Sequence, residues 1–92
     1  MVFNWNDEKN SKLKKTRNIS FEEMVIAIEN GDVPDVIENS AEKYKNQIVI
    51  IVNYQNYVYA VPAVVTADEY FLKTIYPSRK LTAEYLKKPE GK

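Results

Sequence analysis

The stretch QIVIIVNYQNYVYAVPAVV, residues 47–65, predicts the centre of the fold. Residues 47–53 contain five consecutive Ile and Val residues, which is typical of a strand buried on both faces. Residues 54–56 form the turn of a predicted hairpin, and residues 57–65 form its second strand. That strand is bent or released near Pro62, because proline cannot donate a ladder hydrogen bond. The hairpin predicts an antiparallel sheet.

Two further strands are predicted around this hairpin. Residues 33–38 form a strand that Pro34 confines to an edge or to the start of pairing. A polar connection over residues 39–46 then leads into the hairpin. After it, residues 70–76 form a fourth strand that ends before Pro77. An exposed edge at 33–38 can pair with another chain, which leaves the oligomeric state open.

The N-terminal region predicts a first, polar helix. Residues 2–5 form a short strand or an ordered arm, and Asn6 caps a helix that runs to about Arg17. Leu13 is the only large apolar residue in that helix, so we expect the helix to lie on the surface. Trp5 and the residues around it are expected to anchor the helix by packing.

A second helix is the best-determined element of the sequence. Ser20 and Glu23 have the spacing of a capping box, and Gly31 provides the stop. The apolar residues between them recur at helical spacing and are Phe21, Met24, Val25 and Ile28.

A short third helix closes the fold. Ser78 is its expected cap, with Leu81 and Tyr85 on its apolar side, and residues 87–92 are expected to form a frayed tail. The predicted fold class is therefore α+β, with two N-terminal helices, a sheet of about four mainly antiparallel strands and a short C-terminal helix.

Composition limits the class of protein. At 92 residues, 45% of them hydrophobic, the chain is predicted to be a single domain over residues 1–92. It contains no Cys and no His, so thiolate metal sites and histidine bases are excluded, and we expect no metal and no cofactor. The apolar run at 48–52 is too short to span a membrane and no signal peptide is visible, so the predicted location is the cytoplasm.

The formal charge is zero but unevenly distributed along the chain. Residues 1–20 carry five basic and two acidic residues, and residues 71–92 carry six basic and two acidic residues. Residues 21–42 carry seven acidic residues and no basic ones. If the two ends meet in the fold, their surface can attract a polyanion. Solvated helix faces are the simpler explanation of the same pattern.

No phosphate loop, paired-His metal motif or nucleophile elbow is present. Cleavage of RNA does not need these motifs. It can proceed when the 2′-hydroxyl is held in line with the phosphate, with Arg and Lys stabilising charge and Tyr or Lys transferring protons.

Both ends of the chain resemble one family. Trp5, an acidic residue at 7 or 8, Lys9 and Asn10 are followed, after a basic helix, by RNISFEE at residues 17–23. This resembles the N-terminal signature of the BrnT-type bacterial toxins, in which Lys-His-Gly-Val-Ser-Phe-Glu-Glu lies at the same offset. IYPSRK at residues 75–80 is similar to the closing strand of that family. Arg17 and Asn18 stand where the family has His and Gly.

The resemblance implies a RelE-like fold and a ribonuclease toxin of a type II toxin–antitoxin pair. Such a toxin cleaves messenger RNA, inhibits growth, and is neutralised by a small DNA-binding antitoxin, with which it can assemble into a larger oligomer. The implied enzyme is an endoribonuclease that is independent of metal.

Candidate site residues follow from this resemblance and from the chemistry of RNA. The candidate catalytic residues are Arg79, Lys73, Arg17 and Tyr76, and the candidate RNA-binding residues are Lys9, Lys14, Lys80 and Tyr59. Each has a structural alternative: a surface cation for Arg17 and Arg79, an edge lysine for Lys73, and strand packing for the tyrosines. Lys73 is predicted to lie within the last strand, in alternation with Phe71 and Ile75.

Two other functions remain open from the sequence. One is a non-catalytic module that binds a partner protein through an apolar and acidic surface. The other is a degenerate toxin that keeps the fold as a scaffold. Convergence of Arg17, Lys73 and Arg79 on one face would favour catalysis over both.

Overall fold

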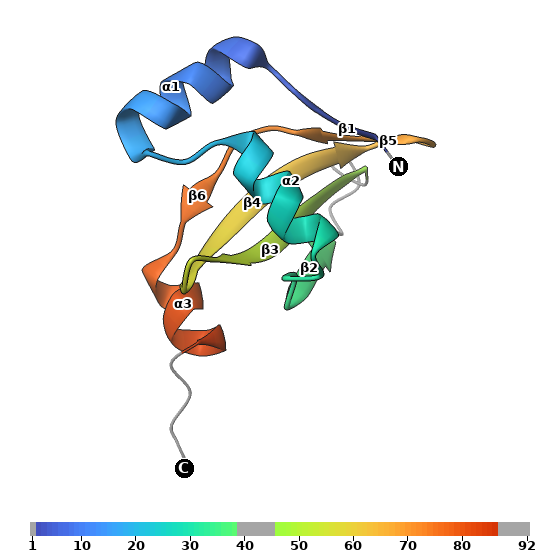
Figure 1. Ribbon diagram of the computed structural model, residues 1–92. Helices are drawn as coiled ribbons and strands as arrows, with labels where there is room; N and C mark the ends of the chain where they lie inside the picture. Colours follow the sequence, from blue (N-terminus) through green and yellow to red (C-terminus); the bar gives the residue numbers. More distant parts are fainter. Residues whose placement is uncertain (1, 39–45, 87–92) are drawn as a thin grey trace.

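The structure is a computed structural model that describes residues 2–38 and 46–86 (Figure 1). Two predicted segments lie outside these residues: the tail at 87–92, and residues 39–45 of the polar connection predicted over 39–46. The helices are α1 (Asp7–Arg17), α2 (Phe21–Glu29) and α3 (Arg79–Tyr85), and the strands are β1 (Val2–Trp5), β2 (Asp35–Glu38), β3 (Gln47–Tyr54), β4 (Tyr57–Val65), β5 (Glu69–Leu72) and β6 (Tyr76–Pro77). The predicted α+β class is confirmed. No helix in the described ranges is long and apolar enough to cross a membrane.

The hairpin of β3 and β4 forms the middle of a mixed sheet with the order β1-β5-β4-β3-β2, and β6 pairs with β4. Its turn residues Gln55 and Asn56 have φ angles of 52° and 63°. Positive φ at both central positions is the type I′ geometry, which matches the twist of two antiparallel strands. The predicted hairpin and the predicted edge strand β2 are both confirmed.

The prediction of about four strands was wrong, because the sheet has six strands within the described residues. The N-terminal segment is a full strand, β1, that pairs in parallel with β5. The strand predicted over residues 70–76 is divided into β5 and β6. Lys73 therefore lies in the break between two strands rather than inside one.

Pro62 provides a physical reason for this break. The main-chain N–H of Lys73 donates to the carbonyl of Pro62 at 2.8 Å. The carbonyl of Pro62 therefore points toward the side of β4 on which β5 lies. Proline has no N–H to return the bond. The ladder between β4 and β5 therefore ends at Pro62. Pairing along β4 resumes at Ala60, which lies opposite Tyr76 of β6.

The predicted helix caps are confirmed. The Asn6 side chain accepts from the Lys9 N–H at 2.9 Å, and Ser20 and Glu23 form the full capping box. The Ser78 hydroxyl accepts from the Leu81 N–H at 3.0 Å and begins α3. These side chains satisfy N–H groups that the first turn of a helix leaves without partners.

Helices α1 and α2 cover one face of the sheet, and the core lies beneath them (Figure 1). The buried residues of this core are Leu13, Ile19, Phe21, Met24, Ala27, Ile50, Val52, Val61, Ala63, Leu72 and Ile75. Trp5 stacks on Phe21 with ring centroids 5.7 Å apart, so its predicted packing role is confirmed. We call this side of the sheet the helix face.

Helix α3 packs at one end of the opposite face. The main-chain N–H of Val58, a fully buried residue of β4, donates to the Thr82 hydroxyl at 2.9 Å. Thr82 is the buried residue of α3, whereas Leu81 and Tyr85, its predicted apolar side, are half-buried. This helix therefore docks through a hydroxyl group.

Candidate functional site: a row of cations beside Tyr76

Arg17 and Tyr76 are the two candidate catalytic residues that the fold brings into contact. Arg17, the last residue of α1, donates from Nη1 to the carbonyl oxygen of Ile75 at 2.6 Å. Its guanidinium carbon lies 5.6 Å from the centroid of the Tyr76 ring, within the range of a cation–π contact. The contact joins the end of α1 to the start of β6, and the two elements lie on the same side of the molecule in Figure 1.

Three more cations lie on the segment that contains Tyr76. Lys73 precedes β6 and is exposed, and Arg79 and Lys80 are exposed residues in the first turn of α3. Residues 73–80 contain no acidic residue. We call Arg17, Lys73, Arg79 and Lys80 the cation row.

The cation row is not neutralised by any carboxylate in the described ranges. The one ion pair there joins Lys14 and Glu22 at 3.9 Å, away from the row. Arg79 and Lys80 also lie at the end of α3 where the helix macrodipole disfavours positive charge. Their placement therefore lowers rather than raises the stability of the helix.

Three candidate RNA-binding residues do not join this row. Lys9 and Lys14 lie on α1, and Lys14 faces Glu22. Tyr59 lies on the helix face, packs against the core and meets the edge of Tyr57 with ring centroids 5.5 Å apart. Burial raises the pKa of its hydroxyl. Because Tyr76 pairs with Ala60, the neighbour of Tyr59 in β4, Tyr59 and Tyr76 project from opposite faces of the sheet.

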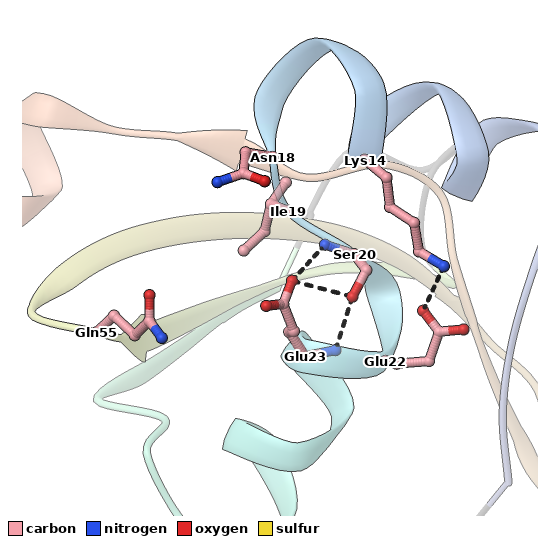
Figure 2. A pocket seen from close by; sticks show the side chains of 7 residues that line it. All are labelled: Lys14, Asn18, Ile19, Ser20, Glu22, Glu23 and Gln55. Atoms are coloured by element: carbon pink, nitrogen blue, oxygen red, sulfur yellow. Dashed lines mark hydrogen bonds and ion pairs between the residues drawn. The ribbon is translucent and has the colours of Figure 1, made fainter.

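A pocket lies between α1, α2 and the β3–β4 turn, and Figure 2 shows the residues that line it. Its carboxylates already have internal partners. Glu23 accepts from the Ser20 N–H and from the Tyr54 hydroxyl, and the latter bond raises the pKa of Tyr54. Glu22 accepts from the side chain of Asn10, which is the main cause of its lowered pKa. These groups hold α2 in place, so we do not assign a site here.

The face opposite α1 and α2 was not identified as a functional surface by the sequence. Register places three successive rows of residues across it. The first row contains Asp35, Ile51, Ala60 and Tyr76; the second contains Ile37, Val49, Pro62 and Lys73; and the third contains Gln47, Val64, Phe71 and Asn4. Lys73 is placed in the second row by the bond from its N–H to the Pro62 carbonyl. Because α3 lies at the end next to the first row, we call the second and third rows together with Tyr76 the open face. Alternation in β3 and β4 predicts which residues share a face, but not whether a helix covers them.

Acidic residues do not form a metal site in the described ranges: no three of them are grouped closely enough to hold an ion. Comparisons with protein-family models, with curated proteins and with solved structures found no match. The function of the chain is therefore inferred from its own residues.

Proposed function

We propose that this protein is an endoribonuclease toxin of a bacterial type II toxin–antitoxin pair, with a RelE-like fold. It would cleave messenger RNA in the cytoplasm, without a metal or cofactor, until a small DNA-binding antitoxin binds it. The class of toxin follows from the resemblance at the two ends of the chain. The observation that supports it is the contact of Arg17 with Tyr76, on a segment, residues 73–80, whose other cations form no ion pair within the described residues. A phosphodiester backbone is the ligand that such a row attracts.

The reaction needs no water in its first step. The 2′-oxygen of a ribose forms a bond to the adjacent phosphorus, and the bond from phosphorus to the 5′-oxygen of the next nucleotide breaks. The 2′-hydroxyl loses its proton to a base, and the leaving 5′-oxygen gains a proton from an acid. The products are a 2′,3′-cyclic phosphate and a 5′-hydroxyl end. Charge on the phosphoryl oxygens rises in the transition state, and cations held in place stabilise it.

The proposed roles follow from position. Arg79 is exposed at the start of α3 and would bind the scissile phosphate, while Lys73 and Tyr76 would act as the proton-transfer pair. Arg17 already contacts Ile75 and Tyr76, so it is better suited to hold the Tyr76 ring than to move toward substrate. We therefore propose Arg17 as a positioning residue.

A second candidate function is a non-catalytic module that binds a partner protein, as a degenerate toxin would. The open face favours this alternative, because Ile37 and Phe71 expose 47% and 37% of their surfaces there. Large apolar side chains grouped on one face often mark a protein interface.

Induced expression in a bacterial host separates the two candidates. For a toxin we expect growth arrest and loss of messenger RNA, with RNA fragments ending in 2′,3′-cyclic phosphate. Arg79→Ala should slow cleavage by about 10²-fold or more, because it removes a cation from the transition state. Lys15→Ala removes an exposed cation of α1 outside the row and should leave cleavage unchanged.

The stability of each variant must be measured beside its activity. Arg79→Ala should unfold at the same temperature as the parent protein or slightly above it, since Arg79 is exposed and its positive charge lies at the end of α3 where the helix macrodipole disfavours it. Unimpaired growth and intact RNA at high soluble expression would reject the ribonuclease and favour the binding module.

A further inference from the structure

The open face is an apolar surface with a cationic border. Val49, Pro62 and Val64 are half-buried at its centre, and Ile37 and Phe71 are exposed on either side. Lys73 completes the row that begins with Ile37, and Tyr76 lies one row closer to α3. Apolar and basic side chains therefore form one continuous surface.

The width of this surface suits a single helix. The four strands from β2 to β5 are separated by three gaps of about 4.8 Å, so the face measures about 14 Å across. An α-helix with its side chains has a diameter of about 10–12 Å. Helix α3 already packs on the neighbouring part of the same face, over Val58.

The charges on this side of the sheet favour an acidic partner. The two carboxylates that the described strands place on this face already accept hydrogen bonds: Asp35 from the Val36 N–H and the Tyr85 hydroxyl, and Glu69 from the Asn4 side chain. The cation row has no carboxylate partner in the described ranges. The charge left unpaired at the border is therefore positive, and acidic side chains on a partner would complement it.

We infer that the open face binds an amphipathic helix of a partner protein, whose apolar stripe packs on Val49, Pro62 and Phe71 and whose acidic flank pairs with the cation row. Such a helix would cover Tyr76 and Lys73 and so block RNA. That the partner acts as an inhibitor rests on the proposed function, whereas the docking of a helix on the open face does not. The edge of β2 is less suited to binding a partner strand, because the Val36 N–H already donates to the Asp35 carboxylate.

Two synthetic peptides test the inference on the purified, full-length protein. Both are fluorescein-labelled, 18 residues long, and carry the same Leu stripe; one has Glu on the flank and the other has Lys. In fluorescence anisotropy we expect the Glu peptide to bind about tenfold more tightly, by charge complementarity. Lys73→Glu should reduce or reverse this preference.

Neighbouring residues of β2 provide a matched pair of variants. Ile37 and Val36 each expose 47% of their surface, but Ile37 lies on the open face and Val36 on the helix face. We expect Ile37→Ser to weaken binding of the Glu peptide about tenfold and Val36→Ser to leave it within about twofold, because only Ile37 touches the docked helix. Thermal unfolding of both variants checks that the fold is retained.

Three outcomes would overturn the inference. The first is that neither peptide binds, or that Val36→Ser weakens binding as much as Ile37→Ser. The second is a dimer in analytical ultracentrifugation that Ile37→Ser dissociates, since a second copy would then occupy the face. The third is that a single-stranded RNA oligonucleotide, and not the Glu peptide, shifts the NMR signals of Ile37 and Phe71. Peptide binding with normal growth and intact RNA on induction would instead reject the ribonuclease while leaving the docking site in place.

Discussion

Asn10 is a single polar residue on which the packing of two helices depends. It lies in α1 but exposes only 5% of its surface. Its Oδ1 accepts from the main-chain N–H of Phe21 at 2.8 Å, and its Nδ2 donates to Glu22 Oε1 at 2.8 Å. Phe21 is the first residue of α2, and its N–H has no partner within the helix. Asn10 thus provides the partner that α2 lacks at its first residue.

Asn10→Ala should lower the free energy of unfolding by about 1–3 kcal/mol, because it leaves the buried N–H of Phe21 unsatisfied. It should also raise the pKa of Glu22 toward its ordinary value, since the Asn10 hydrogen bond is the main cause of the lowering. Urea denaturation measures the first effect and NMR titration of the Glu22 carboxyl measures the second.

Asn4 provides the control for this prediction. Its side chain also donates to a carboxylate, Glu69, but the pair is exposed. Asn4→Ala should therefore change stability by less than about 0.5 kcal/mol, as is usual at surface sites. Equal losses in the two variants would show that the Asn10 bonds are not the cause.

At the scale of the element, the attachment of α3 to β4 fixes the position of Arg79 and Lys80, the two residues of the cation row that lie on this helix. Thr82 is buried, accepts from the Val58 N–H at 2.9 Å and donates to the Ser78 carbonyl at 2.7 Å. Tyr85 adds a bond from its hydroxyl to Asp35 at 3.0 Å, which raises the pKa of that hydroxyl. These two contacts hold a helix of only seven residues, which would not be stable alone.

Thr82→Val keeps the shape of the side chain but removes its hydroxyl, so the Val58 N–H is left buried without a partner. We expect a loss of about 1–3 kcal/mol in the free energy of unfolding, and faster amide hydrogen exchange in α3. Chemical denaturation and hydrogen exchange measure the two effects.

Thr16→Val is the matched control. Thr16 also lies in a helix and donates to the carbonyl four residues earlier, at Lys12, but it is exposed and accepts no buried N–H. Its replacement should change stability by less than about 0.5 kcal/mol. If both threonine variants behaved alike, the bond to Val58 would not be what holds α3.

At the scale of the whole molecule, the fold separates charges that cancel in the sum. The formal net charge is zero, yet the described part of the chain gathers four cations around β6, from the end of α1 to the start of α3. A neutral protein with such a local field binds a polyanion in a strongly salt-dependent way.

Binding of single-stranded RNA should therefore weaken as salt increases. If three or four phosphates are contacted, the plot of log K against log salt should have a slope of about −2 to −3. Lys73→Gln should reduce the magnitude of the slope by about 0.7, and Lys15→Gln, outside the row, should leave it unchanged. A slope near zero, or equal effects of the two variants, would show that the row does not contact phosphates. Anisotropy with a labelled oligonucleotide over a range of salt concentrations makes the measurement.

The sequence alone determined the elements whose signals are local. The caps at Asn6, Ser20 and Ser78 were predicted, and so was the hairpin turn, which lies at residues 55 and 56 of the predicted 54–56, because a cap or a turn depends on a few neighbouring residues. The contact of Arg17 with Tyr76 was not predicted as a contact, although both residues were chosen as candidates. It joins residues at opposite ends of the chain.

Three other features depend on contacts between distant parts of the chain. Pairing of β1 with β5 is parallel and joins segments far apart in the sequence, so no turn residue announces it. The break at Lys73 depends on Pro62 in the neighbouring strand. The open face depends on where α3 docks, through a threonine that no apolar pattern marks. Local sequence specifies caps, turns and alternation, whereas strand partners and the covering of a face depend on long-range contacts that only the folded chain makes.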